Sequence, residues 1–135
     1  MATHHKIKRK EVSKVAINDK CILAYGLKPE EIKKIESQNI KVIEMNNNRA
    51  LMKLEDIICE KTNENSYDEL PLNEKALIFN GFKDEQLKVT IKFIRGFIKG
   101  GVLAVSTTQN YKWTFKYLLE HLVEEREWFE AQGRK

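Results

Sequence analysis

The sequence predicts an α/β fold: a duplicated βαβα unit that forms a small four-stranded, mostly parallel sheet flanked by helices, with a long C-terminal helix. Three observations lead to this prediction. Short apolar runs alternate with stretches in which apolar residues recur at the helical period. Residues 18–30 match residues 73–85 at a constant offset of 55. An apolar stripe at helical spacing continues almost to the end of the 135-residue chain.

Four apolar runs are the predicted strands: CILAY at 21–25, KVIEM at 41–45, ALIF at 76–79 and VLAV at 102–105. Three of them are almost continuously apolar, which is typical of strands covered on both faces in a parallel sheet. We expect the strands of each unit to be parallel, with right-handed crossovers. Strand order 2-1-3-4 is the first choice, although the segment between the units is long enough for other orders.

A glycine and then a helix start follow the first strand of each unit. Gly26 precedes Pro29, which suits a first helical position, and Gly81 precedes Asp84, which suits an N-cap. The helix of the second unit has an apolar stripe made of Leu87, Ile91, Ile94 and Ile98. We expect the last helix to run from about 110 to 131, with a stripe made of Tyr111, Phe115, Leu118, Leu122 and Phe129.

The match between the two halves sets the predicted domain boundaries. Five residues are identical at the offset of 55, so that Asn73, Lys75, Gly81, Lys83 and Glu85 repeat Asn18, Lys20, Gly26, Lys28 and Glu30. A weaker match relates 41–60 to 101–120 at an offset of 60. Within one compact domain we therefore expect a basic arm at 1–16, a first copy at 17–60, a polar linker at 61–72 and a second copy with the extended helix at 73–135.

The net charge of +4 belongs to the N-terminal arm, because residues 1–14 hold five basic side chains and one acidic one. Such an arm can contact phosphate backbones, but we favour a solvated tail and expect nucleic acid not to be a partner. The longest apolar runs are far shorter than the roughly 20 residues of a membrane span, so we expect no membrane contact. With two cysteines inside apolar patterns, a cytoplasmic protein is expected.

The second copy resembles a known family. Its segments LIFNGFKDEQL, GVLAVSTTQNYKW and LLEHLVEEREWF are similar to the bacterial domain of unknown function 3783, over about residues 74–130. The run from Thr108 to Trp113 is the most specific part of the resemblance. The first copy departs from it, because Asn46–Asn48 replace the Ser-Thr-Thr turn and Lys53 stands at the place of Trp113. The family implies no activity.

Hydroxyl and amide side chains gather at the turn after the fourth strand. Ligands of open α/β sheets bind beyond the carboxyl ends of strands, where helix N-termini present free N–H groups. A phosphate or carboxylate site would therefore use Asn80, Gly81, Ser106, Thr107, Thr108 and Asn110. The same residue types are the preferred helix caps, and Asn46–Asn48 fill the equivalent turn of the first copy. We favour capping over a ligand site.

The remaining reactive residue types predict no catalytic residue, no metal site and no cofactor. Trp113 at helical spacing favours a core position over stacking on a base or sugar. His121 is the only histidine outside the arm. The apolar settings of Cys21 and Cys59 disfavour reactive thiolates, and the acidic residues between 124 and 130 indicate a solvated helix face.

Two classes of function stay open, with a third, weaker one. The first is a non-enzymatic binding or assembly module, and the second is a small-molecule or nucleotide-binding domain that uses the Ser106–Asn110 turn. The third is an RNA-associated protein that uses the basic arm.

Trp128 and Phe129 are the predicted interface. A helix over 110–131 spans about 33 Å, whereas a five-residue strand covers about 17 Å, so the helix overhangs its sheet. Its two aromatic residues need a cover. A second copy in a homodimer, another protein, or apolar residues of the N-terminal segment such as Ile7 and Val12 would provide it.

Overall fold

The computed structural model describes residues 19–61 and 65–133, and the basic arm predicted at 1–16 lies outside them. Two halves follow each other along the chain, each with a strand, a helix, a second strand, a 3-10 turn and a second helix. The first half contains β1 (Cys21–Tyr25), α2 (Pro29–Glu36), β2 (Lys41–Met45), η1 (Asn47–Arg49) and α3 (Leu54–Ile58). The second contains β3 (Ala76–Asn80), α4 (Asp84–Arg95), β4 (Val102–Val105), η2 (Asn110–Lys112) and α5 (Phe115–Gly133).

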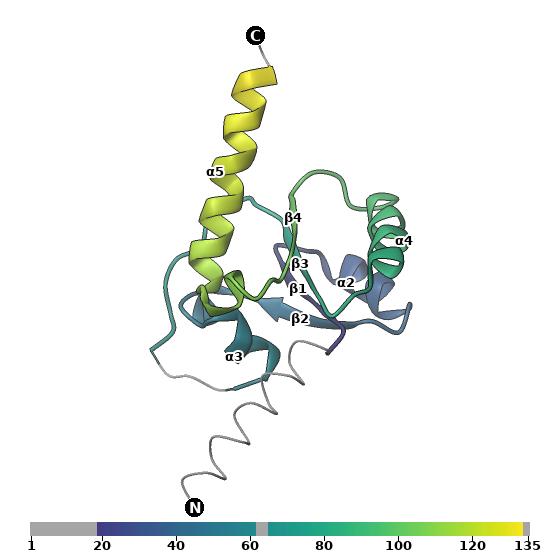
Figure 1. Ribbon diagram of the computed structural model, residues 1–135, viewed down its shortest axis with the longest axis horizontal. Coiled ribbons are helices and arrows are strands. Elements are labelled where there is room, and N and C mark those ends of the chain that lie inside the picture. Colours follow the sequence, from purple (N-terminus) through teal and green to yellow (C-terminus); the bar gives the residue numbers. More distant parts are fainter. Residues whose placement is uncertain (1–18, 62–64, 134–135) are drawn as a thin grey trace, which may run out of the picture.

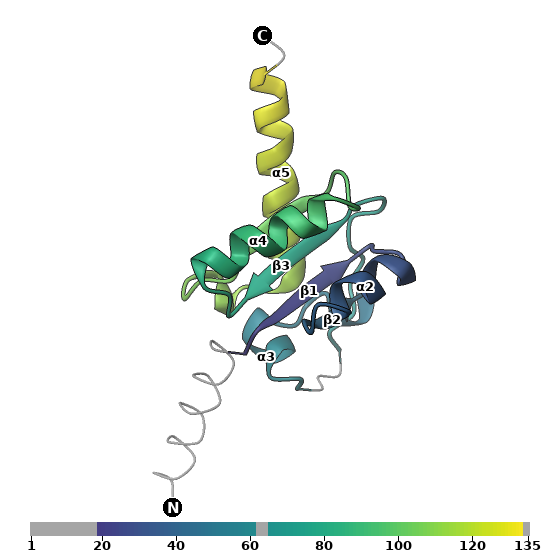
Figure 2. The ribbon, with the colours of Figure 1, turned by 90° about the vertical axis from the view of Figure 1, so that its right-hand side faces the viewer.

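The strands form one four-stranded sheet in the order β2-β1-β3-β4. Within each half the two strands are parallel, and the central pair β1–β3 is antiparallel. The predicted α/β class, the strand order 2-1-3-4 and the parallel pairing within each half are therefore confirmed. Helices α2 and α4 cover one face of the sheet, and α3 and α5 cover the other (Figures 1 and 2). The far end of α5 projects well beyond the sheet (Figure 1).

A local two-fold relation connects the halves, because Leu23 pairs with Ile78 at the centre of β1 and β3 and these residues lie 55 positions apart. The second alignment is wrong by one residue. Lys41 pairs with Cys21 as Val102 pairs with Ala76, which makes the offset 61 instead of 60. Lys53 thus corresponds to Thr114, not to Trp113, and the two form an isolated antiparallel bridge. A common origin of the halves stays a prediction.

Alternating side chains of the strands build two cores. One lies under α3 and α5 and includes Leu23, Ile78, Ile57, Phe115 and Leu119. The other lies under α2 and α4 and includes Ile22, Leu77, Phe79, Ile35 and Ile94. The continuous apolar runs CILAY and ALIF are the two central strands, as expected of strands with apolar residues on both faces, whereas the equally apolar VLAV is an edge strand in which Val105 is exposed.

The last helix begins later than predicted. Residues 110–112 form the separate 3-10 turn η2, and α5 starts at Phe115. Trp113 is extended (φ −81°, ψ 149°), and its carbonyl accepts a hydrogen bond from the N–H of Leu54 in the other half. Thr114 then caps α5, because its Oγ1 accepts from the N–H of Tyr117 at 3.1 Å. The spacing of apolar residues predicted one continuous helix from about 110, and this contact between the halves interrupts it.

The described part of the predicted linker is bound to both halves. The Tyr25 hydroxyl donates to the Pro71 carbonyl at 2.8 Å, and Asp68 pairs with Lys116 of α5 at 2.7 Å. Just after it, Glu74 accepts two hydrogen bonds from Arg126 at 2.7 and 2.8 Å. This segment therefore fixes the direction of α5. Within the described part of the chain, no helix combines the length and the apolar character needed to cross a membrane.

Candidate functional site

A pocket of about 660 Å³ lies at the carboxyl ends of β3 and β4. It is lined by residues from the two strand ends and from the turns that follow them: Asn80, Gly81, Phe82, Lys83, Val105, Ser106, Thr107, Thr108 and Tyr111. Every residue of the predicted ligand set except Asn110 is thus brought to one pocket. Asn110 is buried and does not line it.

The polar side chains of this turn bond mostly to the chain itself. The Ser106 hydroxyl donates to Asn80 Oδ1 at 2.6 Å, and Asn80 Nδ2 donates to the Asp19 carbonyl. Thr107 and Asn110 bond reciprocally, because Asn110 Oδ1 accepts from the Thr107 N–H at 2.7 Å and Thr107 Oγ1 accepts from the Asn110 N–H at 3.0 Å. These bonds close the turn that leads into η2, whose N-cap residue Gln109 makes no side-chain cap bond, and they do not start the long helix. The ligand role stays a prediction.

Tyr111 is the residue of this pocket that its surroundings do not satisfy. Its side chain is buried (5% exposed), and among the described residues its hydroxyl has no hydrogen-bond partner. Burial raises the pKa of this hydroxyl, while the nearby Asn80 amide lowers it by less. A buried donor without a partner lowers the stability of the fold, so a bound ligand with an acceptor atom next to this hydroxyl would remove that penalty.

Trp113 is half-buried and packs against the core, as predicted. Its ring meets those of Tyr117 and His121 edge-on, at centroid distances of 4.9 and 5.7 Å. His121 also lies 2.9 Å from Glu125. No group of three metal-ligating side chains occurs among residues 19–61 and 65–133. The three rings form an aromatic cluster at the start of α5.

The outer edge of β4 is the feature that the sequence analysis missed. The N–H of Val102 donates to the carbonyl of Lys75, just before β3, at 2.8 Å, and the N–H of Ser106 donates to the carbonyl of Phe79 in β3 at 2.9 Å. Because residues of a strand alternate, Leu103 and Val105 direct their N–H and C=O groups away from β3. No described strand pairs with them. Asn110 Nδ2 donates to the Val105 carbonyl at 3.1 Å, so that among the described residues the N–H and C=O of Leu103 and the N–H of Val105 remain open.

The other edge of the sheet is protected in a way that β4 is not. In β2, Lys41 and Glu44 are exposed, and Lys41 pairs with Glu60 at 3.0 Å. Charged side chains on an edge strand oppose pairing with another chain. The register places Val105 at the position that Glu44 has in β2, and Val105 is apolar and 42% exposed. The contrast between KVIEM and VLAV is the signal that predicts an open edge once the strand order is known.

The run from Thr108 to Trp113 and the strand and helix around it are thus in place as the resemblance implied. Residues 75–129 match the Domain of unknown function (DUF3783). The DUF3783 segment covers β3, α4, β4 and α5 as far as Phe129, so both the pocket and the open edge belong to it. No curated protein and no solved structure matches the chain.

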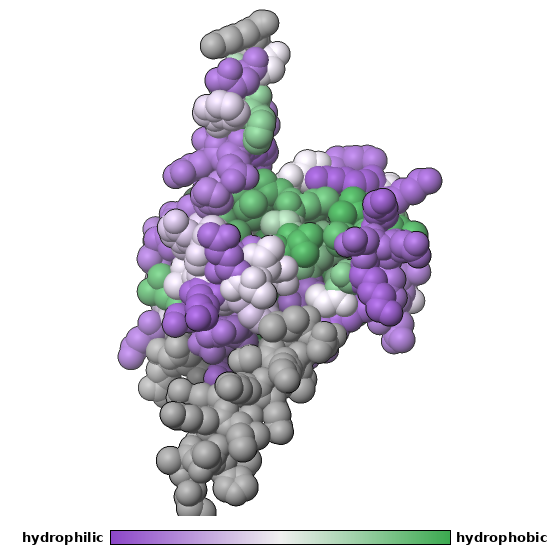
Figure 3. Space-filling view, viewed as in Figure 1, coloured by the Kyte–Doolittle hydropathy of each residue, from purple (hydrophilic) through white to green (hydrophobic). Residues whose placement is uncertain are grey.

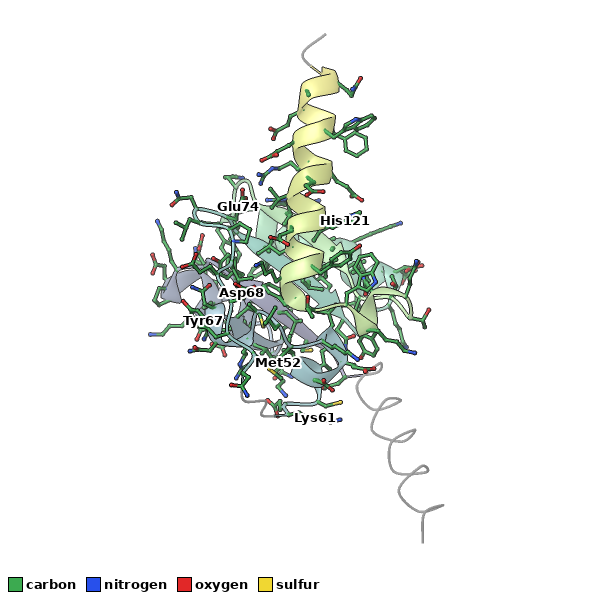
Figure 4. The ribbon with its side chains drawn as sticks, turned by 90° about the vertical axis from the view of Figure 1, so that its left-hand side faces the viewer. Met52, Lys61, Tyr67, Asp68, Glu74 and His121 are labelled. Carbon is green, nitrogen blue, oxygen red and sulfur yellow. The ribbon has the colours of Figure 1, made fainter. Side chains whose placement is uncertain are left out.

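The end of the DUF3783 segment is the exposed part of α5. Trp128 and Phe129 are 58% and 65% exposed, and their rings meet at 5.1 Å. Tyr117, 54% exposed, and His121 precede Trp128 by eleven and seven residues, which places the three on one side of a helix. Figure 4 shows His121 and Glu74 on opposite sides of α5. The predicted cover by the N-terminal segment involves residues outside those described.

The first turns of the same helix pack beside β4, because Leu118 and Leu119 share a core with Val102. Figure 3 shows a hydrophobic surface between α5 and α4, over β4, in the view of Figure 1. We call the outer edge of β4 together with the exposed Tyr117, His121, Trp128 and Phe129 of α5 the β4–α5 face. Open backbone groups and exposed aromatic rings on one side of a molecule are the two elements of a strand-pairing interface.

Proposed function

We propose that this chain is a non-enzymatic binding or assembly module whose binding surface is the β4–α5 face. The open N–H and C=O groups of Leu103, on an edge strand without charged side chains, carry the proposal. Strand addition at such an edge supplies backbone hydrogen bonds, and the neighbouring rings supply apolar area. We also propose a bacterial cytoplasm as its setting and a duplicated βαβα unit as its origin, both of which rest on the sequence.

The polar residues of the neighbouring turn support a binding module better than an enzyme. Ser106, Thr107 and Asn110 each bond to the chain itself, which leaves them poorly placed to move protons. Burial raises the pKa of the Cys21 thiol to about 11, so it is protonated at neutral pH and a poor nucleophile. We therefore assign the β4–α5 face a role in binding and not in catalysis.

Cross-linking in cells tests the proposed surface. An amine-reactive reagent is added to bacteria that express the chain, and mass spectrometry identifies lysines joined to any second polypeptide. We expect intermolecular links from Lys99, which precedes β4, and from Lys112, which ends the 3-10 turn η2 before α5, and few links from Lys41 of the opposite edge.

A matched pair of variants gives the control. Val105→Glu copies onto β4 the charge that Glu44 has in β2, and combined with Trp128→Ala it should abolish the links from Lys99 and Lys112. Glu44→Lys changes the equivalent position of the protected edge and should leave them unchanged. Intermolecular links that survive Val105→Glu/Trp128→Ala, or that start from Lys41, would contradict the proposal.

A small-molecule or phosphate-binding domain is the second candidate, and the unsatisfied hydroxyl of Tyr111 favours it. A thermal-shift screen against nucleotides, inorganic phosphate and carboxylates tests it, since a ligand at 100 times its dissociation constant stabilises by about 2.7 kcal/mol. The shift should disappear in Tyr111→Phe and persist in Tyr117→Phe. RNA binding through the basic arm is the weaker alternative, and salt-dependent retention on a polyanion that is lost without residues 1–14 would support it.

A further inference from the structure

We infer that the partner of the β4–α5 face is a second copy of this chain, joined β4 to β4 in antiparallel orientation around a two-fold axis. The inference rests on the proposed function and names its partner. The two sheets then continue into each other, and each β4 becomes an interior strand. Such a contact uses the same surface patch on both copies and closes after two subunits.

The backbone of β4 determines the register of this contact. Within the described part of the chain, Leu103 is the residue of β4 whose N–H and C=O are both open, since Asn110 occupies the Val105 carbonyl. Antiparallel strands contain residue pairs that exchange both hydrogen bonds. One residue that offers a free donor and a free acceptor is therefore complementary to itself, and Leu103 lies opposite Leu103 of the second copy. This register places the open Val105 N–H opposite Gly101 of the second copy.

The same kind of pairing already joins the two halves inside the chain. There β1 and β3 pair antiparallel around the Leu23–Ile78 pair, and both outer strands run parallel to their neighbours. A β4–β4 contact repeats this arrangement at the next position of the sheet. The right-handed twist that suits one antiparallel junction suits the second, so the sheet can continue without a change in geometry.

The direction of α5 adds a side-chain contact of complementary charge. The chain turns after β4 and η2, so α5 runs back past the sheet and overhangs the end where β4 begins (Figure 1). A two-fold axis through Leu103 reverses this direction in the second copy. The acidic, overhanging part of α5, with exposed Glu124, Glu127 and Trp128, then lies toward the start of the second α5.

That start carries the opposite charge and a second group of rings. Lys112 is exposed at the end of η2, shortly before α5, and Trp113, Tyr117 and His121 form the aromatic cluster next to it. Trp128 of each copy therefore meets the aromatic cluster of the other, and the glutamates meet Lys112. A chain of unrelated sequence would have to provide a free strand, an acidic helix and aromatic rings in this same order, whereas a second copy has all three.

Light scattering after size exclusion, on the full purified chain over a range of concentrations, tests the inference. We expect a dimer at high micromolar concentration. Trp128→Ala should raise the dissociation constant of the dimer by roughly 30-fold or more, the value of an interface hot spot. Val105→Glu should give a monomer, and Glu44→Lys should leave the dimer unchanged. Circular dichroism verifies that each variant is folded.

Hydrogen exchange locates the contact independently of any variant. The amide of Leu103 should be protected in the dimer and become exchangeable on dilution to the monomer, in step with the loss of mass. A wild-type chain that stays monomeric overturns the inference. A dimer that survives Val105→Glu, or in which Leu103 exchanges freely, overturns the β4–β4 contact.

The failure of the inference and that of the proposed function are distinguishable. If the purified chain is monomeric while Lys99 and Lys112 are linked in cells to a different polypeptide, the second copy is excluded and the binding surface stands. If the chain is monomeric and these lysines form no intermolecular links, both are excluded.

Discussion

Replacing Gly26 with alanine tests how the two halves meet. Gly26 follows β1 with a φ of +75°, and a Cβ atom there would lie 2.1 Å from the carbonyl oxygen of Glu74, which precedes β3. Gly81 has the same relation to the Asp19 carbonyl, at 2.8 Å. Each glycine thus allows one half to approach the backbone of the other half closely. A side chain at either position would fit only if the strand next to it moved.

Gly100→Ala is the matched control. Gly100 has a φ of +72°, but a Cβ atom there would meet nothing within 4 Å. Its replacement should therefore show the conformational penalty alone, about 1 kcal/mol. Gly26→Ala adds the overlap with a backbone oxygen, for which overpacking values suggest a further 2 kcal/mol or so. We expect a total loss in the free energy of unfolding of about 3 kcal/mol.

Urea unfolding followed by circular dichroism measures the difference. With a denaturant slope of about 1.5 kcal/mol per molar, the midpoint should fall by about 2 M for Gly26→Ala and by about 0.7 M for Gly100→Ala. Equal shifts in the two variants would refute the reasoning, because they would mean that the close approach of Glu74 does not matter. A shift in the slope would indicate a change in compactness instead.

Three further predictions concern single side chains. Asn110→Ala removes the bonds to Thr107 and Val105 and should lower the free energy of unfolding by about 2 kcal/mol. Asn46→Ala removes one exposed cap bond and should lower it by about 1 kcal/mol or less. Equal losses for the two variants in urea unfolding would contradict this prediction. Arg126 holds the pKa of Glu74 below its ordinary 4.5, so the stability from this pair is complete above that pH and is lost as the pH falls below it. Arg126→Met should therefore flatten the acid side of the stability curve, and Arg49→Met should not. Cys21 is fully buried, so its alkylation at neutral pH should follow global unfolding and accelerate with urea; labelling of the folded chain at the rate of an exposed thiol would contradict its position.

The strands were predictable because their information is local. Runs such as CILAY and ALIF are apolar at successive positions, short, and followed by turn residues, which together are typical of strands covered on both faces. The start of α5 was not predictable in the same way. The extended residue Trp113 accepts a hydrogen bond from Leu54 of the other half, and no residue near Trp113 in the sequence indicates that partner.

The candidate site, too, was predictable where the information is local and not where it depends on contacts between distant residues. The residues that line the pocket follow from their position after two strands, but their hydrogen bonds do not, because Asn80 and Ser106 become partners only when β3 and β4 lie side by side. The open edge also depends on the strand order, since VLAV reads equally well as an interior strand. Trp128 and Phe129 were found from helix length alone, and they are exposed.

The antiparallel pairing of β1 with β3 has a consequence for folding. Each half contributes two parallel strands, and a two-stranded sheet is too small to be stable by itself in water. Neither half is therefore an autonomous folding unit, and the contacts that complete the sheet join residues such as Leu23 and Ile78 across the whole middle of the chain. We expect cooperative folding, limited by loop closure between the halves. A chain cleaved between α3 and β3 should yield two fragments that are unfolded when separate and regain structure when mixed.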